Sequence, residues 1–172
     1  MSGYDHLITT IKSIIYNDSL DLDLNESDVE LIRSLPVNVV IPILQDVFEH
    51  ETDPTIQARA YRQILSYRDF DKVGFVLDMF DKSTAGWQVA YCESLSHYKD
   101  SRAISKLSKV LLENTDPDVR FSAAEALEEI GDSTSVEALE YAIQNDQGVD
   151  YGGFSVSKMA HEALLKVRRR IE

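Results

Sequence analysis

The residues of this chain that could perform catalysis are a cysteine, a glutamate and a histidine that lie close together in the sequence. Glu93 and His97 are four positions apart, so on a helix they share one face and could form a general acid–base pair or bind a metal. Cys92 could act as a nucleophile, but a nearby carboxylate raises the pKa of a thiol rather than lowering it. We interpret Glu93 and His97 as an exposed surface pair, and Cys92 as a small buried thiol.

The rest of the chain lacks the spacings that define catalytic and metal-binding motifs. The four histidines, at positions 6, 50, 97 and 161, are scattered along the sequence. Gly152 and Gly153 are followed by Phe-Ser-Val-Ser-Lys, whereas a phosphate-binding P-loop continues as Gly-Lys-Ser or Gly-Lys-Thr. We therefore expect a protein with no catalytic site, no bound metal and no cofactor.

Composition limits the class of protein and the partners it could bind. The 172 residues are 44% hydrophobic and 27% charged, which fits a single compact domain. The formal net charge of −13 disfavours nucleic acid, because phosphate backbones would be repelled. The sequence has one cysteine, an N-terminus unlike a secretory signal and no apolar run of the length a bilayer requires. We expect a cytoplasmic protein with no membrane-spanning segment.

The elements that must position these residues form an internal repeat. Asp53 and Pro54 introduce the segment DPTIQARAYRQILSYRD, and Asp116 and Pro117 introduce DPDVRFSAAEALEEIGD 63 positions later. A degenerate copy, WQVAYCESLSHYKD, lies between them, and a fourth copy, VSKMAHEALLKV, follows an insertion. In the two clearest copies, Asp is placed to cap a helix and Pro to occupy its first turn.

Each copy is preceded by another helical segment, so the repeat unit is a helix pair in which the copy is the second helix. The predicted partner helices cover residues 38–50, 70–80, 102–114 and 136–144. Two antiparallel helices cannot bury both of their apolar faces alone, so such pairs stack on one another. The sequence predicts an all-α fold, a right-handed α-solenoid of stacked antiparallel helix pairs. We expect one domain over residues 1–172, with capping helices over 1–35 and four repeats over 36–172.

Two segments depart from the repeat. Before it, periodic apolar residues predict a helix over 4–16, and Ser27 with Glu30 has the spacing of a capping box for a second helix, which Pro36 ends. The acidic stretch at residues 21–30 belongs to this expected cap. Near the other end, the glycine-rich residues 145–154 predict an exposed loop longer than most connections within helical arrays.

The third copy, together with the following SVEALEYAI, resembles the short HEAT-like repeat of the phycobilisome-lyase (E-Z) type. Through periodicity the resemblance covers about residues 36–170, and Arg120 matches the arginine of the family motif. Gln57, Gln88 and Ser157 stand at the counterparts of Arg120 in the other copies. The resemblance implies an α-solenoid whose second helices line a concave face that holds another protein. Some relatives are bilin lyases or act on light-harvesting complexes.

If the second helices line that face, the positions beside their buried stripe are the candidates for partner binding. Applying the offsets of the third copy to the others places cations near one end, an apolar strip of Val89, Phe121 and Met159, and acids in the middle. Such a face suits an extended or helical protein segment. The candidates are Arg59, Arg62, Val89, Glu93, His97, Phe121, Ser122, Glu125, Glu129, Lys158, Met159 and Glu162.

Several large aromatic residues leave alternatives open. Trp87 and Tyr91 fall on offsets that belong to the seam between helices, which favours core packing. Tyr61 replaces an alanine of the third copy, so it either fills a wider gap between units or faces the groove.

The leading hypothesis is a non-catalytic module that binds a protein or peptide on the concave face. One alternative is a bilin lyase-like subunit or a chaperone acting on phycobiliproteins. In the lyase-like case, Arg59 and Arg62 would bind the two propionates and Tyr61 and Tyr91 would flank the tetrapyrrole. A second alternative is an acidic regulatory or immunity protein that neutralises a basic partner. Binding of that kind weakens steeply with salt.

Overall fold

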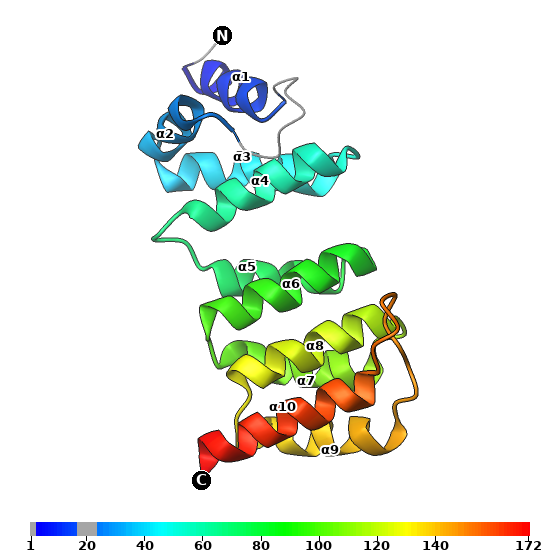
Figure 1. Ribbon diagram of the computed structural model, residues 1–172. Coiled ribbons are helices and arrows are strands. Elements are labelled where there is room, and N and C mark those ends of the chain that lie inside the picture. Colours follow the sequence, from blue (N-terminus) through cyan, green and yellow to red (C-terminus); the bar gives the residue numbers. More distant parts are fainter. Residues whose placement is uncertain (1–2, 17–23) are drawn as a thin grey trace. The chain divides into compact units, whose positions relative to one another are not determined.

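The computed structural model describes residues 3–16 and 24–172, with side chains from residue 6 onward. Over these ranges the chain is built from helices, and its β structure is one isolated bridge, which confirms the all-α prediction. The chain divides into two compact units, Met1–Lys72 and Val73–Glu172, which are described separately below (Figure 1). Residues 17–23, which hold part of the expected acidic cap, lie outside the described residues.

The first unit contains two capping helices and one complete helix pair. Its helices are α1 (Gly3–Ile15), α2 (Glu26–Ser34), α3 (Val37–His50) and α4 (Pro54–Ser66). Helices α3 and α4 pack along each other, and α1 lies against both. Asp53 caps α4 through the backbone amides of its first turn, as the Asp-Pro motif predicts.

The start of α2 differs from the sequence prediction. Asn25 is the N-cap residue, and its side chain accepts a hydrogen bond from the amide of Asp28. The predicted capping box of Ser27 and Glu30 is therefore wrong, because an amide side chain two positions earlier already satisfies the free end of the helix. At the other end, the hydroxyl of Tyr67 donates to the carbonyl of Ile32 at 2.7 Å.

The second unit consists of three helix pairs. These are α5 (Lys72–Phe80) with α6 (Ala85–Tyr98), α7 (Arg102–Glu113) with α8 (Pro117–Ile130), and α9 (Val136–Asn145) with α10 (Val156–Ile171). A single 3-10 turn, Ser133–Ser135, leads into α9. Within this unit α6, α8 and α10 form one layer, and α5, α7 and α9 lie behind them (Figure 1). This is an α-solenoid arrangement of stacked antiparallel pairs.

Small side chains allow the front layer to pack closely. Ala123, Ala124 and Ala126 of α8 are all buried, and α8 packs against both α6 and α10. Gly131 caps the C-terminal end of α8, and its amide donates to the carbonyl of Leu127. A Cβ atom at Gly131 would lie 2.5 Å from that carbonyl oxygen, so only glycine fits this turn.

One repeat position plays the same structural role in three pairs. The side chains of Gln57, Gln88 and Arg120 each donate to backbone carbonyls at or just beyond the end of the helix that precedes their own. Glutamine therefore replaces arginine without loss of this contact, which satisfies carbonyls that the helix itself leaves unpaired. Gln57 and Gln88 therefore make the same kind of backbone contact as Arg120.

The helix spans agree with the sequence prediction to within about two residues. The division between the units falls after residue 72, so each unit keeps its helix pairs essentially whole. The expectation of one continuous domain over residues 1–172 stays a prediction. In the part of the chain that the structure describes, no helix has the length and apolar composition needed to cross a bilayer.

Candidate functional site

A pocket of about 370 Å³ opens on the front layer of the second unit, between α6 and α8. We call it the carboxylate pocket, and it is lined by Val89, Glu93, Ser96, Ser122, Glu125, Ala126, Glu128 and Glu129. Glutamates supply four of its eight lining residues, and small or apolar side chains supply the rest. The pocket therefore combines negative charge with a surface that can be desolvated.

The charges of this pocket are only partly balanced by the protein. The ammonium group of Lys166 on α10 lies 2.9 Å from Glu128 and 3.6 Å from Glu129, and these two carboxylates raise its pKa. Among the described residues, Glu93 and Glu125 have no hydrogen-bonding or ion-pair partner for their carboxylates. One lysine therefore offsets part of the charge of four glutamates, and the pocket keeps a negative potential.

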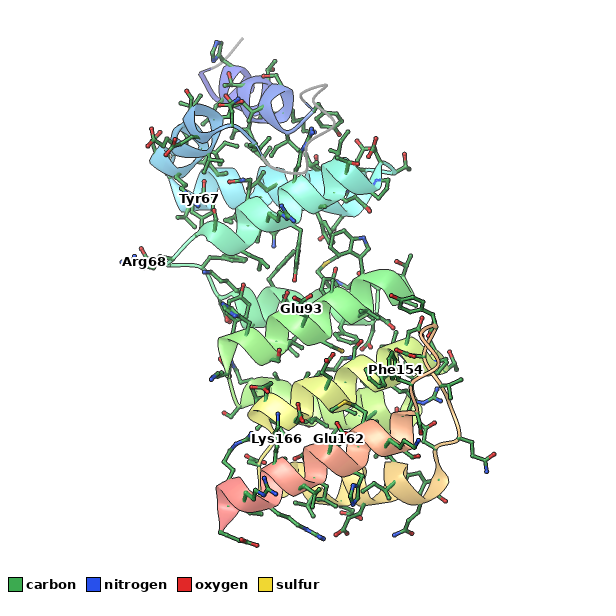
Figure 2. All side chains as sticks on the ribbon, in the orientation of Figure 1. Tyr67, Arg68, Glu93, Phe154, Glu162 and Lys166 are labelled. Carbon is green, nitrogen blue, oxygen red and sulfur yellow. The ribbon has the colours of Figure 1, made fainter. Side chains whose placement is uncertain are left out.

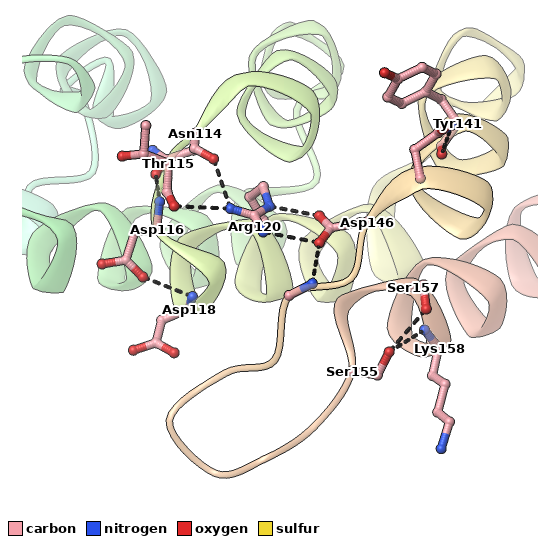
Figure 3. Close-up of polar contacts among 12 residues, drawn as sticks. Asn114, Thr115, Asp116, Asp118, Arg120, Tyr141, Asp146, Ser155, Ser157 and Lys158 are labelled. Carbon is pink, nitrogen blue, oxygen red and sulfur yellow. Dashed lines mark hydrogen bonds and ion pairs between the residues drawn. The ribbon is translucent and has the colours of Figure 1, made fainter.

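A tightly bonded cluster fixes the beginning of α8 (Figure 3). Nε and Nη2 of Arg120 donate to the two carboxylate oxygens of Asp146 at 2.6 and 3.0 Å, and Nη1 donates to the carbonyls of Asn114 and Thr115. The amide of Gly148 also donates to Asp146 at 2.7 Å. This cluster ties the end of α9 to the beginning of α8.

The electrostatics of the cluster favour its charged form. Burial opposes ionisation of Asp146, but the hydrogen bonds from Arg120 and Gly148 and the charge of Arg120 outweigh it and lower the pKa of the carboxyl group. The hydrogen bonds with Asp146, together with its charge, raise the pKa of Arg120. Asp146 therefore carries its charge at neutral pH, inside a largely covered contact.

The long connection between α9 and α10 is an ordered hairpin. In this connecting hairpin, residues 146–155, Val149 and Ser155 form an antiparallel bridge. The amide of Tyr151 donates to the carboxylate of Asp118 on α8 at 2.6 Å. The ring of Phe154 lies 6.3 Å from the ring of Phe121, centroid to centroid. The prediction of an exposed loop here is confirmed, and the loop is attached to α8.

The structure brings five of the twelve sequence candidates together around the carboxylate pocket: Val89, Glu93, Ser122, Glu125 and Glu129. His97, Lys158 and Glu162 are exposed on the same layer of helices, outside the pocket lining. Glu93, Glu162 and Lys166 are labelled on this layer of helices in Figure 2. Arg62 is exposed on α4 of the first unit. Phe121 is half-buried against Phe154.

Two candidates are not available at the surface, and their placement in a groove is wrong. Arg59 is only 2% exposed, because α1 covers it and the carbonyl of Ile15 accepts a hydrogen bond from its Nη1 at 3.1 Å. Met159 is 8% exposed, because it continues the buried stripe of α10 between Val156 and Ala163. The predicted apolar strip therefore loses Met159 and gains Phe154.

The aromatic residues left open by the sequence belong to the interior. Tyr61 is buried, and its ring lies 5.7 Å from that of Phe48. Tyr91 is fully buried between Phe80 and a half-buried Trp87. With Arg59 also covered, three of the four residues considered for a bilin cannot reach a ligand from solvent. They do not form the open aromatic and cationic cleft that this alternative requires.

The possible catalytic groups occupy the positions expected of a surface pair and a core thiol. Glu93 and His97 are both exposed. Cys92 is fully buried, and burial raises the pKa of its thiol to about 12. A thiol with such a pKa is protonated at neutral pH and is a poor nucleophile. Within the described ranges, no three histidine, cysteine, aspartate or glutamate side chains form a group that could hold a metal ion.

Sequence reasoning missed several residues of this surface. Ser96 lies three positions after Glu93, and Glu128 lies three after Glu125, so extending each face by one more helical step would have found both. Asp146 and Phe154 gave no such signal, since their contacts with α8 join residues 26 and 33 positions apart.

Comparison with known proteins agrees with this geometry. Residues 79–150 match a family model described as HEAT repeats. This part of the second unit is therefore similar to HEAT repeats, while the narrower resemblance to the phycobilisome-lyase type stays a prediction. Neither a search of curated proteins nor a search of solved structures found a match.

Proposed function

We propose that this protein is a non-catalytic binding module that holds a basic segment of a partner protein against α6 and α8. The observation that carries the proposal is the carboxylate pocket, in which Glu93 and Glu125 have no counter-charge among the residues that the structure describes. HEAT repeats commonly mediate protein interactions, which supports a protein as the ligand. The net charge of −13 supports a basic segment rather than an acidic one.

The pocket offers a simple mode of recognition. A lysine or arginine of the partner can place its charged end between Glu93 and Glu125, on facing helices, and lay its aliphatic stem on Val89. Partly exposed ion pairs of this kind contribute about 0.5–1 kcal/mol each. Two such pairs correspond to roughly a 5- to 30-fold change in affinity. They also select basic over acidic partners.

The test is a selection of displayed random linear peptides on the immobilised full chain, followed by affinity measurements on the enriched peptides. We expect the peptides to be basic and to bind the Glu93→Gln/Glu125→Gln variant roughly 5- to 30-fold more weakly. Rising ionic strength should weaken binding to the wild-type protein.

A matched control is available on the opposite layer. Asp78→Asn/Glu137→Gln changes the net charge equally, and both side chains are exposed, on α5 and α9. This control should bind the peptides as the wild type does. If both double variants bind them equally, or if no peptide is enriched, the proposal is wrong.

A further inference from the structure

The connecting hairpin holds large apolar side chains in solvent. Tyr151 is 95% exposed, Phe154 65% and Val149 52%. Aromatic side chains of this size usually bury most of their surface, and at interfaces they are frequent anchors. A long connection with such a composition is a candidate for a binding role.

The backbone of the hairpin is fixed, so these side chains are presented in a set geometry. The amide of Asp150 donates to the carbonyl of Phe154 at 2.9 Å, and the amide of Phe154 donates to the Asp150 carboxylate at 2.7 Å. Gly153 adopts a φ of +83°, which favours glycine, and its amide donates to the carbonyl of Asp150. Asp118 holds the tip from α8. An anchor ordered in advance loses little conformational entropy when a partner binds.

The hairpin adjoins the carboxylate pocket along α8. Phe154 contacts Phe121, and Phe121 precedes Glu125 by one helical turn and Glu129 by about two. With a rise of about 1.5 Å per residue, the two glutamates lie about 6 and about 12 Å along the helix from Phe121. An apolar contact and an acidic contact are therefore aligned on one helix face.

We propose that the connecting hairpin is the apolar subsite for the same segment that the carboxylate pocket binds. An extended chain advances about 3.3 Å per residue, so distances of about 6 and 12 Å correspond to about two and about four positions. Side chains at these spacings point to the same side of an extended chain. The segment therefore carries one apolar residue on Tyr151 and Phe154, and basic residues about two or four positions away.

Charge argues for a basic partner over a second copy of this chain as the occupant. With a net charge of −13, two copies repel each other, and the carboxylate pocket beside the hairpin is negative. A basic segment with one apolar anchor complements both features. This inference rests on the proposed function, because it assigns the second contact of the same bound segment.

The test compares the enriched peptides on two variants of the full chain. Tyr151→Ser/Phe154→Ser removes the exposed rings but leaves the backbone hydrogen bonds of the hairpin in place. Leu112→Ser/Tyr141→Ser is the matched control, since it removes two exposed apolar side chains from α7 and α9. Because Tyr151 is almost wholly in solvent, Tyr151→Ser alone serves if the double variant does not fold.

We expect the hairpin variant to bind the peptides at least fivefold more weakly and the control to bind them as the wild type does. The enriched sequences should carry an apolar residue about two or four positions from a basic one. Peptides that require Glu93 and Glu125 but bind the hairpin variant normally would overturn this inference and leave the proposed function intact. Peptides that require the hairpin but not the two glutamates would overturn both the claim that one segment contacts the hairpin and the carboxylate pocket and the proposed function itself.

Discussion

Replacing Arg120 by methionine tests whether the cluster at the start of α8 stabilises the second unit. The substitution removes all four hydrogen bonds that Arg120 donates, to Asp146 and to the carbonyls of Asn114 and Thr115. It keeps a long apolar side chain in place, so the loss of packing is small. The carboxylate of Asp146 is left with the amide of Gly148.

The expected loss of stability follows from the burial of this pair. The side chains of Arg120 and Asp146 are only 16% and 10% exposed, so the remaining carboxylate is poorly hydrated. Removing one partner of a buried ion pair costs about 3–5 kcal/mol, and a pair with some exposure belongs at the lower end, about 3 kcal/mol. For a chain of this length that corresponds to a fall in melting temperature of roughly 6–12 °C.

The pH dependence of this loss has a defined sign. The pKa of Asp146 is lower in the folded protein than its usual value of 3.8. The pair therefore contributes its full stabilisation above pH 3.8, and the contribution disappears as the pH falls through the folded-state pKa. The difference in unfolding free energy between wild type and Arg120→Met should be constant near neutrality and should shrink in acid.

The assay is thermal and denaturant unfolding followed by circular dichroism, with Arg169→Met as the control. Arg169 is exposed on α10, so its substitution should change stability by less than about 0.5 kcal/mol. Adding Asp146→Asn to Arg120→Met should recover about 1 kcal/mol, because the unpaired charge is removed. Equal melting temperatures for Arg120→Met and Arg169→Met would refute the reasoning.

Two further predictions concern glycine packing and the cysteine. Gly131→Ala should destabilise the protein by about 1–3 kcal/mol in denaturant unfolding, because the new Cβ would lie 2.5 Å from the carbonyl oxygen of Leu127. Gly86→Ala meets nothing within 4 Å and should stabilise α6 by about 0.5 kcal/mol, so equal effects would contradict this account. Cys92 should resist a thiol-specific reagent at pH 8 in the native protein, since burial raises its pKa to about 12, and should react in guanidinium. Fast labelling of the native protein would disagree with the buried position.

The helices could be predicted because their signals are local. The Asp-Pro pairs at residues 53–54 and 116–117 each combine a cap with a first-turn proline, and the apolar spacing between them fixes the register of the repeat. The offsets of the third copy also identified Glu93 and Glu125, which the structure places on one pocket. Residues at equivalent positions of a repeat lie at the same level on neighbouring helices, so offsets transfer well inside the array.

The same offsets failed where the contacts come from outside the repeat. Arg59 is covered by α1, a helix that is not part of the repeated pattern. The contacts of the connecting hairpin with α8 depend on chain segments far apart in sequence, and no periodicity records them. Met159 shows a third cause, since its counterpart in the third copy is the half-buried Ser122, and a long apolar side chain at this position joins the buried stripe of α10.

The attachment of the connecting hairpin to α8 has a mechanical consequence. A pull on Tyr151 or Phe154 is transmitted through Asp118 and Arg120 to the preceding helix pair, as well as along the hairpin's own backbone. The last two helix pairs therefore share any tension that a tethered cargo exerts. The hairpin therefore links neighbouring helix pairs mechanically, and force applied to it reaches α8 without first unfolding α10.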